Sequence, residues 1–256
     1  MYVVLSPSKK LEEKPSIRGE CTIPELIDQS DVLIKNLKTK SVSDIASLMG
    51  LSDALAQLNA DRYQAYSTPF NQDNASQALW TFKGDVYDGL DADSLSDKDA
   101  KFAQQHVRIL SGLYGLLRPF DLMQPYRLEM GCRFSGSWGK NLYDFWGDQL
   151  SCKLKEQMAK DKEDVLINLA SNEYFKAIKP KTLNMKVITI GFKEYKNGGY
   201  KSLMLYVKRA RGMMARYIIT HKLKCPENLK DFSEDGYKFE ASMSDDDNYM
   251  FVRKAQ

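Results

Sequence analysis

The sequence predicts a mixed α/β fold, built as a single compact domain over residues 1–256 with a helical part near the N-terminus. Apolar runs of strand length alternate with amphipathic helical segments, and neither a repeat nor a low-complexity linker divides them. Hydrophobic residues make up 43% of the chain and charged residues 28%, which is typical of a globular protein. A chain of this length can bury a substantial core.

The first half of the chain begins with a short strand and continues into helices. Residues 2–5 are apolar and are followed by Ser6 and Pro7, which predicts a buried strand. A helical subregion follows over 22–66, where Thr22 and Glu25 match a capping box. The predicted elements are a strand over 2–5, helices over 24–38, 43–49 and 52–66, a strand over 78–83, and a helix over 97–110.

The second half alternates helices and strands. Asn197-Gly198-Gly199 is a strong hairpin signal between two strand-like runs. Val207, Ala210 and Met214 recur at helical spacing and are expected to face the core. The predicted elements are a helix over 148–159, strands over 164–170, 185–195 and 200–205, a helix over 207–222, and short strands over 237–240 and 249–253.

The charges are segregated along the chain, although the net charge is only +3. Lys179–Lys224 holds twelve Lys/Arg and one acid, Glu194, whereas residues 227–256 hold eight acids and four bases, and residues 85–99 hold six Asp and one Lys. Such segregation predicts a basic surface that binds an anion, most simply nucleic acid. The alternative is that the acidic tail over 227–256 neutralises a basic helix in space.

Other functional classes have little sequence support. The four cysteines form no C-x-x-C pair, and neither His106 nor His221 has a partner at metal-ligand spacing, so we predict no metal site and no cofactor. No run approaches the roughly 18 apolar residues of a membrane helix, and no signal peptide is recognisable. We therefore expect a cytoplasmic protein with reduced thiols.

The first candidate motif is the turn between the two short helices. Met49-Gly50-Leu51-Ser52 resembles the hairpin of a helix-hairpin-helix motif, in which glycine permits the turn and the next helix offers its N-terminal amides to a phosphate. Lys38 and Lys40 are expected to contact phosphates nearby. An ordinary corner between two helices is the alternative, because glycine turns of that kind are common.

The second candidate is the basic helix over 207–222. Lys208 and Arg211 share one face, and Arg209 and Arg216 share another. Cations arranged in this way contact phosphates without reading the base sequence. A polar face is also what any amphipathic helix presents to solvent.

Polar residues at predicted strand ends and in loops form a third group. Ligands tend to bind at strand ends in α/β sheets, so an enzyme of unknown reaction using a Lys/Asp/Tyr/Arg cleft is the alternative function. Within 111–131, a buried structural ion network is an equally open interpretation. The pocket candidates are Ser6, Asp85, Tyr87, Asp121, Tyr126, Glu129, Asn168 and Glu173, together with the cations Lys9, Lys83, Arg118 and Arg127.

Several longer motifs resemble one known family. They are Ser6-Pro-Ser-Lys9, Phe82-Lys-Gly-Asp-Val-Tyr87, Leu110-Ser-Gly-Leu-Tyr-Gly-Leu-Leu-Arg-Pro119, Asp121-Leu-Met-Gln-Pro-Tyr-Arg-Leu-Glu-Met-Gly131, Phe145-Trp-Gly-Asp148, Asn168-Leu-Ala-Ser171 with Glu173-Tyr174, and Arg211-Gly212 with Arg216. Together they are similar to the YaaA peroxide-stress-resistance family over nearly the whole chain.

The resemblance implies a bacterial cytoplasmic protein that helps cells survive hydrogen peroxide by lowering free intracellular iron and limiting damage to DNA. It also implies DNA binding through a helix-hairpin-helix and a basic cleft. The matching hairpin is Met49–Ser52, and the cleft candidates are Lys9, Lys83, Arg118, Arg127, Arg209, Arg211 and Arg216. We expect double-stranded or distorted DNA as the partner, and iron control as an indirect effect.

Overall fold

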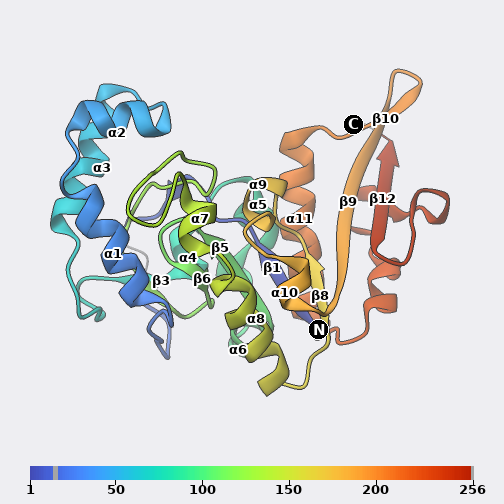
Figure 1. Cartoon of the computed structure of the whole chain (residues 1–256). Coiled ribbons are helices and arrows are strands. Elements are labelled where there is room, and N and C mark those ends of the chain that lie inside the picture. Colours follow the sequence, from blue (N-terminus) through green and yellow to red (C-terminus); the bar gives the residue numbers. More distant parts are fainter. Residues whose placement is uncertain (14–16, 255–256) are drawn as a thin grey trace.

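A central β-sheet lies between two layers of helices in the computed structural model, which describes residues 1–13 and 17–254 (Figure 1). The strands of this sheet are β1 (Tyr2–Leu5), β5 (Val107–Ser111), β6 (Gly115–Leu117), β8 (Val165–Asn168), β9 (Lys186–Lys196), β10 (Gly199–Lys201), β11 (Lys238–Phe239) and β12 (Asn248–Lys254). Their order is β11-β12-β9-β8-β1-β5-β6, with β10 paired to β9. The five strands from β12 to β5 are parallel, and β6, β10 and β11 pair antiparallel. The predicted mixed α/β class is confirmed.

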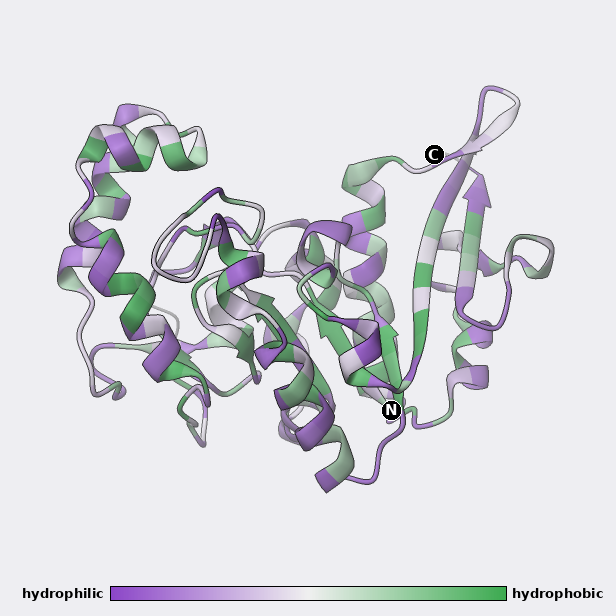
Figure 2. Cartoon of the chain, in the orientation of Figure 1, coloured by the Kyte–Doolittle hydropathy of each residue, from purple (hydrophilic) through white to green (hydrophobic). Residues whose placement is uncertain are grey.

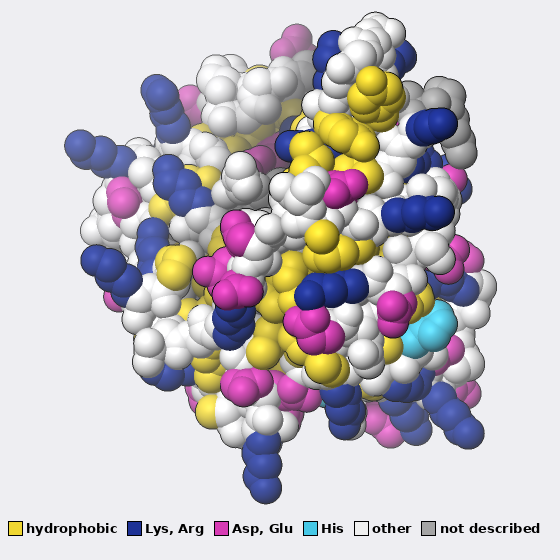
Figure 3. Space-filling view, turned by 90° about the vertical axis from the view of Figure 1, so that its right-hand side faces the viewer, with side chains coloured by type: hydrophobic (Ala, Val, Ile, Leu, Met, Phe, Trp, Pro, Cys, Tyr) yellow, Lys and Arg dark blue, Asp and Glu magenta, His cyan; other side chains and the backbone are white. Residues whose placement is uncertain are grey.

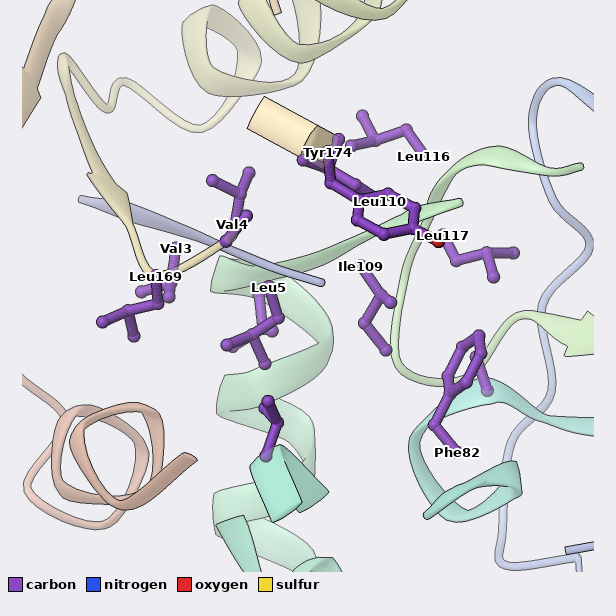
Figure 4. Close-up of a cluster of buried hydrophobic side chains, with 14 of the residues drawn as sticks. Val3, Val4, Leu5, Phe82, Ile109, Leu110, Leu116, Leu117, Leu169 and Tyr174 are labelled. Carbon is purple, nitrogen blue, oxygen red and sulfur yellow. The ribbon is translucent and has the colours of Figure 1, made fainter. Parts of the chain in front are cut away.

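The centre of the sheet is apolar on both faces. All four residues of β1 are buried, and β1 pairs with β5 on one side and β8 on the other. Val4 and Leu110 project to one face of the sheet, beneath Tyr174, while Leu5 and Ile109 project to the opposite face (Figure 4). A strand buried on both faces needs a mainly apolar run, which is why these strands are largely hydrophobic (Figure 2), although β5 also contains the buried Arg108.

Helices cover each face of the sheet (Figures 1 and 4). One layer contains α7 (Leu142–Trp146), α8 (Gln149–Lys160), α9 (Asn172–Phe175) and α10 (Pro180–Leu183), and the other contains α5 (Asp85–Leu90), α6 (Asp97–His106) and α11 (Met204–Thr220). Helices α5 and α11 touch through their backbones, because a Cβ on Gly212 would lie 1.8 Å from the Val86 carbonyl oxygen. This contact fixes the position of α11.

Three helices form an arm on the side of the molecule away from β12 (Figure 1). They are α1 (Ile27–Leu37), α2 (Val42–Met49) and α3 (Asp53–Ala65). The Tyr63 hydroxyl donates a hydrogen bond to the Arg127 carbonyl oxygen. The Gln124 side-chain amide exchanges hydrogen bonds of 3.1 and 2.9 Å with the backbone of Ser67. The buried side chains of Tyr63 and Gln124 therefore attach the arm to the rest of the molecule.

Short elements complete the described chain. They are β2 (Lys10–Leu11), paired with β4 (Phe82–Lys83), β3 (Ser76–Gln77), paired with β7 (Leu122–Met123), α4 (Ala78–Thr81), and 3-10 turns over Ala92–Ser94, Pro226–Asp231, Glu234–Gly236 and Ala241–Met243. None of the helices in the described part of the chain is long and apolar enough to span a bilayer.

The predicted capping box at the start of the arm is wrong. The Thr22 hydroxyl donates a 2.6 Å hydrogen bond to the Asp121 carboxylate, and Thr22 forms a β-bridge with Asp121. The first helix begins later, at Ile27, and its N-cap Leu26 makes no side-chain capping bond. The Thr22 hydroxyl, which the motif predicts to cap the helix, instead bonds a residue that is distant in the sequence.

Three other predicted elements differ from the structure for related reasons. The expected strand over 78–83 is mostly the buried helix α4, because an apolar run without clear period does not distinguish buried helix from buried strand. The helix expected over 97–110 ends at His106, since Val107–Ser111 pairs with β1 inside the sheet. The strand expected over 200–205 ends at Lys201, and α11 begins at Met204.

The backbone contact between α5 and α11 predicts a large effect of one methyl group. Gly212→Ala places a Cβ against the Val86 carbonyl and should lower the free energy of unfolding by roughly 1–3 kcal/mol or more. Gly199→Ala is the matched control, because its added Cβ meets no atom within 4 Å. Chemical denaturation of both variants checks this, and equal losses of stability would contradict the packing argument.

His106 predicts a pH dependence of stability. Its ring packs against Phe102 at 4.3 Å between centroids, and burial lowers its pKa to about 4. As the pH falls from about 6.5 to 4, the unfolded chain takes up a proton that folded His106 does not, so stability falls by up to about 3 kcal/mol. Denaturation midpoints should show a shallower acid slope for His106→Asn. An acid slope of His106→Asn equal to that of the wild type would contradict this prediction.

Candidate functional site

The carboxyl ends of β1 and β8 open into a polar region. Within this sheet, β5 is the next strand after β1 in the sequence and pairs with one edge of β1. The later strand β8 pairs with the other edge, so the strand order reverses at β1. Such a switch point, outside the carboxyl ends of parallel strands, is where ligands bind in open α/β sheets. Ser6 follows β1, and its Oγ accepts a 2.8 Å hydrogen bond from the Ser171 amide, in the loop after β8.

Two adjoining cavities occupy this region. The larger, about 760 Å³, lies between α2 and the loop after Glu129, with Lys40, Met49 and Arg133 in its walls. The smaller, about 330 Å³, lies between the loop after β1, the start of α5, and α11. Both are lined by Lys9, Glu129 and Glu173, and we call the combined surface the groove.

Glu129 lies at the junction of the two cavities. Its Oε1 is 3.0 Å from Lys9 Nζ and accepts a 2.8 Å hydrogen bond from Arg127 Nε. Although burial opposes ionisation, the Lys9 ammonium and the Arg127 guanidinium hold the pKa of Glu129 below its usual range. The sequence motif thus places a carboxylate between two cations, and its negative charge is offset within the groove.

Other predicted pocket residues support the walls of the groove. Tyr87, whose pKa is raised by burial, donates a 3.0 Å hydrogen bond to the Ser6 carbonyl oxygen. Tyr126 lies 2.6 Å from the Ser111 hydroxyl and is also buried. Asn168 Oδ1 accepts a hydrogen bond from the Ala170 amide, and the Glu173 carboxylate accepts one from the Gly131 amide. These groups position the loops, and Asp85 and Glu173 reach the groove itself.

Arg118 and Asp121 lie elsewhere. The Arg118 guanidinium donates hydrogen bonds of 3.0 and 2.8 Å to the fully buried Asp121 carboxylate and also pairs with Glu25. This pair forms an ion network of the kind that the sequence left open, and it secures the start of the arm. Lys83 pairs with Asp93 and lines neither cavity of the groove.

Helix α11 divides its cations between two sides, as its spacing predicted. Lys208 and Arg211 line the smaller cavity of the groove. Arg209 and Arg216 line a separate hollow of about 260 Å³. Arg216 donates hydrogen bonds to the carbonyl oxygens of Leu90 and Asp91 there. The sequence-derived cleft therefore does not form one surface.

Within the described residues, aspartates pair with four of the twelve cations of the basic stretch. Lys208 Nζ is 3.9 Å from Asp85, Arg216 Nη1 is 3.6 Å from Asp91, and Lys222 pairs with Asp99. In the C-terminal part, Lys186 pairs with Asp247 at 2.7 Å, whereas Glu194, the one acid of the stretch, pairs with Arg253 of the tail at 2.6 Å. On the side that carries β12, basic and acidic side chains are interspersed (Figure 3). The local charge of +11 therefore overstates the basic surface.

The hairpin region has the backbone expected for a tight turn. Gly50 has a left-handed conformation (φ 60°, ψ 45°) and ends α2, while Ser52 precedes α3. The Ser52 side chain makes no capping hydrogen bond. Lys38 donates to the Tyr66 carbonyl oxygen at 3.0 Å, which occupies it within the arm, and Lys40 is exposed at the groove. Leu51 is half-buried beside the turn.

Sequence reasoning missed several groove residues. Lys10, Arg133 and Ser171 line the cavities but were not among the predicted site residues, and Lys10 and Arg133 lie outside the quoted motifs. Ser171 had one usable signal, since it follows a buried strand as Ser6 does. Cys132, beside Glu129, gave no signal because isolated cysteines are common in cores. Among the described residues, no group of three or more His, Cys, Asp or Glu is arranged to hold a metal ion.

The fold and groove define a mixed-sheet α/β protein with a polar groove at the carboxyl edge of the sheet, bordered by a helical arm. The chain belongs to the family described as peroxide stress protein YaaA, which matches residues 1–243. A UPF0246 protein of Colwellia psychrerythraea is 53% identical over 255 residues, covering 99% of both chains. UPF0246 proteins of Ralstonia nicotianae and Bordetella petrii are 51% and 52% identical, covering 100% of both chains.

The groove cysteine is predicted to be chemically inert. Burial, together with the nearby Glu129 carboxylate, raises the pKa of the Cys132 thiol from 9.0 to about 12, so its thiolate fraction falls about a thousandfold. At pH 8, a disulfide reagent should modify the exposed Cys152 and Cys225 much faster than Cys132. Mass mapping of labelled peptides measures the order. Labelling of Cys132 as fast as that of Cys152 would contradict the prediction.

Proposed function

We propose that this protein binds double-stranded or distorted DNA along the groove and thereby protects DNA during peroxide stress. The observation that carries the proposal is one continuous groove with cations at both ends and in the middle. Its lining contains six Lys/Arg and four Asp/Glu, and one of those acids, Glu129, is already spanned by Lys9 and Arg127. The lining cations are Lys9, Lys10, Lys40, Arg133, Lys208 and Arg211.

The Gly50 turn supports the same function. Because the Ser52 hydroxyl makes no capping bond, the first-turn amides of the 13-residue helix α3 keep their capacity to bind a phosphate oxygen. Gly50 and Ser52 are exposed, and Met49 lies at the edge of the larger cavity. The proposal therefore joins the hairpin and the groove into one binding surface, with Arg209, Arg216, Lys83 and Arg118 outside it.

Membership of a peroxide stress family gives the binding a context. DNA is a target of oxidative damage, and a protein bound to its backbone would shield it. We place the protein in the bacterial cytoplasm, with the lowering of free intracellular iron as an indirect effect of its action. The proposal assigns no iron ligand and no cofactor to the groove.

General acid–base catalysis, the alternative function, has weaker support. Two groove side chains that could transfer protons have pKa values shifted away from neutrality, downward for Glu129 and upward for Cys132. Tyr87 and Tyr126, which could donate protons, are buried and engaged in hydrogen bonds within the walls. Catalytic groups are usually tuned toward the working pH.

DNA binding should be strongly dependent on salt, because each phosphate contact releases a counterion. For a labelled duplex and a bubbled duplex, Lys40→Gln and Lys208→Gln should each weaken binding and reduce the slope of log affinity against log salt by about one. The control is Lys155→Gln, an exposed lysine of α8 with the same charge change. Fluorescence anisotropy between roughly 50 and 200 mM salt measures the slopes.

Two outcomes would reject this proposal. The first is that the wild-type protein binds neither duplex at the lowest salt. The second is that Lys155→Gln weakens binding as much as the two groove variants, because attraction to the whole positive chain would then explain the binding.

A further inference from the structure

Arg211 is a cation without a counterion in the described part of the chain. Its Nε atom is shielded from solvent and has no hydrogen-bond acceptor, and no ion pair involves its guanidinium. Lys208 and Arg216 of the same helix each lie within 4 Å of an aspartate. Burial also lowers the pKa of Arg211, which is what a guanidinium without an anion experiences. Shielding such a charge from water is costly, so an anion at this position would stabilise it.

The cavity beside Arg211 offers hydrogen-bond donors from several elements. Ser6 and Ser171 come from the loops after β1 and β8, and Lys208 comes from α11. Ser6 Oγ donates to Ser171 Oγ at 3.3 Å, and within the described residues Ser171 Oγ donates to no acceptor. Its proton is therefore available to a ligand. Asp85 also lines this cavity, close to Lys208.

The donors are held in place before any ligand arrives. The backbone contact of Gly212 with Val86 locks α11 against α5 next to Arg211. The buried Tyr87 hydroxyl holds the Ser6 carbonyl, and the Ser171 amide holds the Ser6 hydroxyl. A preorganised set of donors loses little conformational freedom on binding, which favours tight recognition of a small anion.

We propose that the cavity at Arg211 binds a phosphate monoester, with the guanidinium on two phosphate oxygens and Lys208 and Ser171 on the remaining oxygen. A planar guanidinium matches phosphate geometry, and a monoester presents three terminal oxygens to donors on different walls. At about 330 Å³ the cavity is at the small end of ligand sites, which suits an end group. The adjoining cavity of about 760 Å³ provides space for the rest of the molecule.

Two molecules carry this chemistry, a mononucleotide and a nucleic-acid strand with a terminal phosphate. The terminal phosphate of a nucleic-acid strand can be the ligand only if DNA binds in the groove, so this alternative rests on the proposed function. The mononucleotide does not, since it would occupy the same two cavities by itself. The shared phosphate monoester is what the cavity recognises, and the experiment separates the two sources.

The first arm uses deoxyadenosine 5′-monophosphate, with deoxyadenosine as the unphosphorylated probe, measured by calorimetry. Arg211→Gln should weaken the phosphate-dependent binding roughly ten- to hundredfold. Arg209→Gln removes the same charge two positions earlier, on the side of the separate hollow, and should leave the affinity unchanged. Arg211→Gln should fold normally, because it removes a cation without a partner, and circular dichroism checks this.

The second arm uses one oligonucleotide sequence in three forms, with a 5′-phosphate, with a 3′-phosphate, and with hydroxyls at both ends. A phosphate-dependent gain in affinity that Arg211→Gln abolishes supports the site, with the strand end as its ligand. Binding of the mononucleotide alone, again dependent on Arg211, supports the site with the mononucleotide as its ligand.

The proposal is overturned if no phosphorylated probe binds better than its unphosphorylated partner, or if Arg209→Gln reduces that gain as much as Arg211→Gln. The proposed DNA binding could still stand in the first case, because oligonucleotides would bind whether or not they carry a terminal phosphate. Conversely, binding of the mononucleotide without any binding of oligonucleotides would reject the proposed function and keep this site.

Discussion

The parallel pairing of β1 between β5 and β8 is the constraint on which the rest of the structure depends. β1 has only four residues, all fully buried, so it must be covered on both faces and paired on both edges. The chain leaves β1 and β8 at the same edge of the sheet, which brings Ser6 next to Ser171. The groove exists at this edge because parallel strands end together there and the chain then turns to opposite sides.

The cations near this edge of the sheet fall into two groups, those paired with aspartates and those without such a partner. Asp85, Asp91 and Asp99 come from the segment of α5 and α6 and pair with Lys208, Arg216 and Lys222 in and just after α11, so the basic stretch is partly neutralised within the fold. What remains in the groove is a smaller set of cations around Glu129, together with Arg211, for which the described chain provides no anion. Net charge along the sequence is therefore a weaker guide to ligand binding than the location of the cations that lack a partner.

The helical arm connects the same site to the core. Tyr63 and Gln124 fasten the arm to the loop that carries Arg127 and Glu129, so the walls of the larger cavity come from segments about 80 residues apart. The Gly50 turn ends α2 at the edge of this cavity. A rigid attachment means that the arm and the sheet edge present one surface to a partner, rather than two independent ones.

The sequence by itself determined the mixed α/β class, most helices, the Asn197 hairpin and the family, because these follow from local periodicity, turn chemistry and long motifs. It also predicted the two basic faces of α11 from helical spacing. Only the tertiary structure decided that Thr22 bonds Asp121, that Arg118 pairs with Asp121, and that Val107–Ser111 is a strand. The tertiary structure also decided that Arg211 has no counterion in the described part of the chain. Its type and spacing are local, but whether a charge finds a partner depends on segments distant in the chain, which local sequence patterns do not encode.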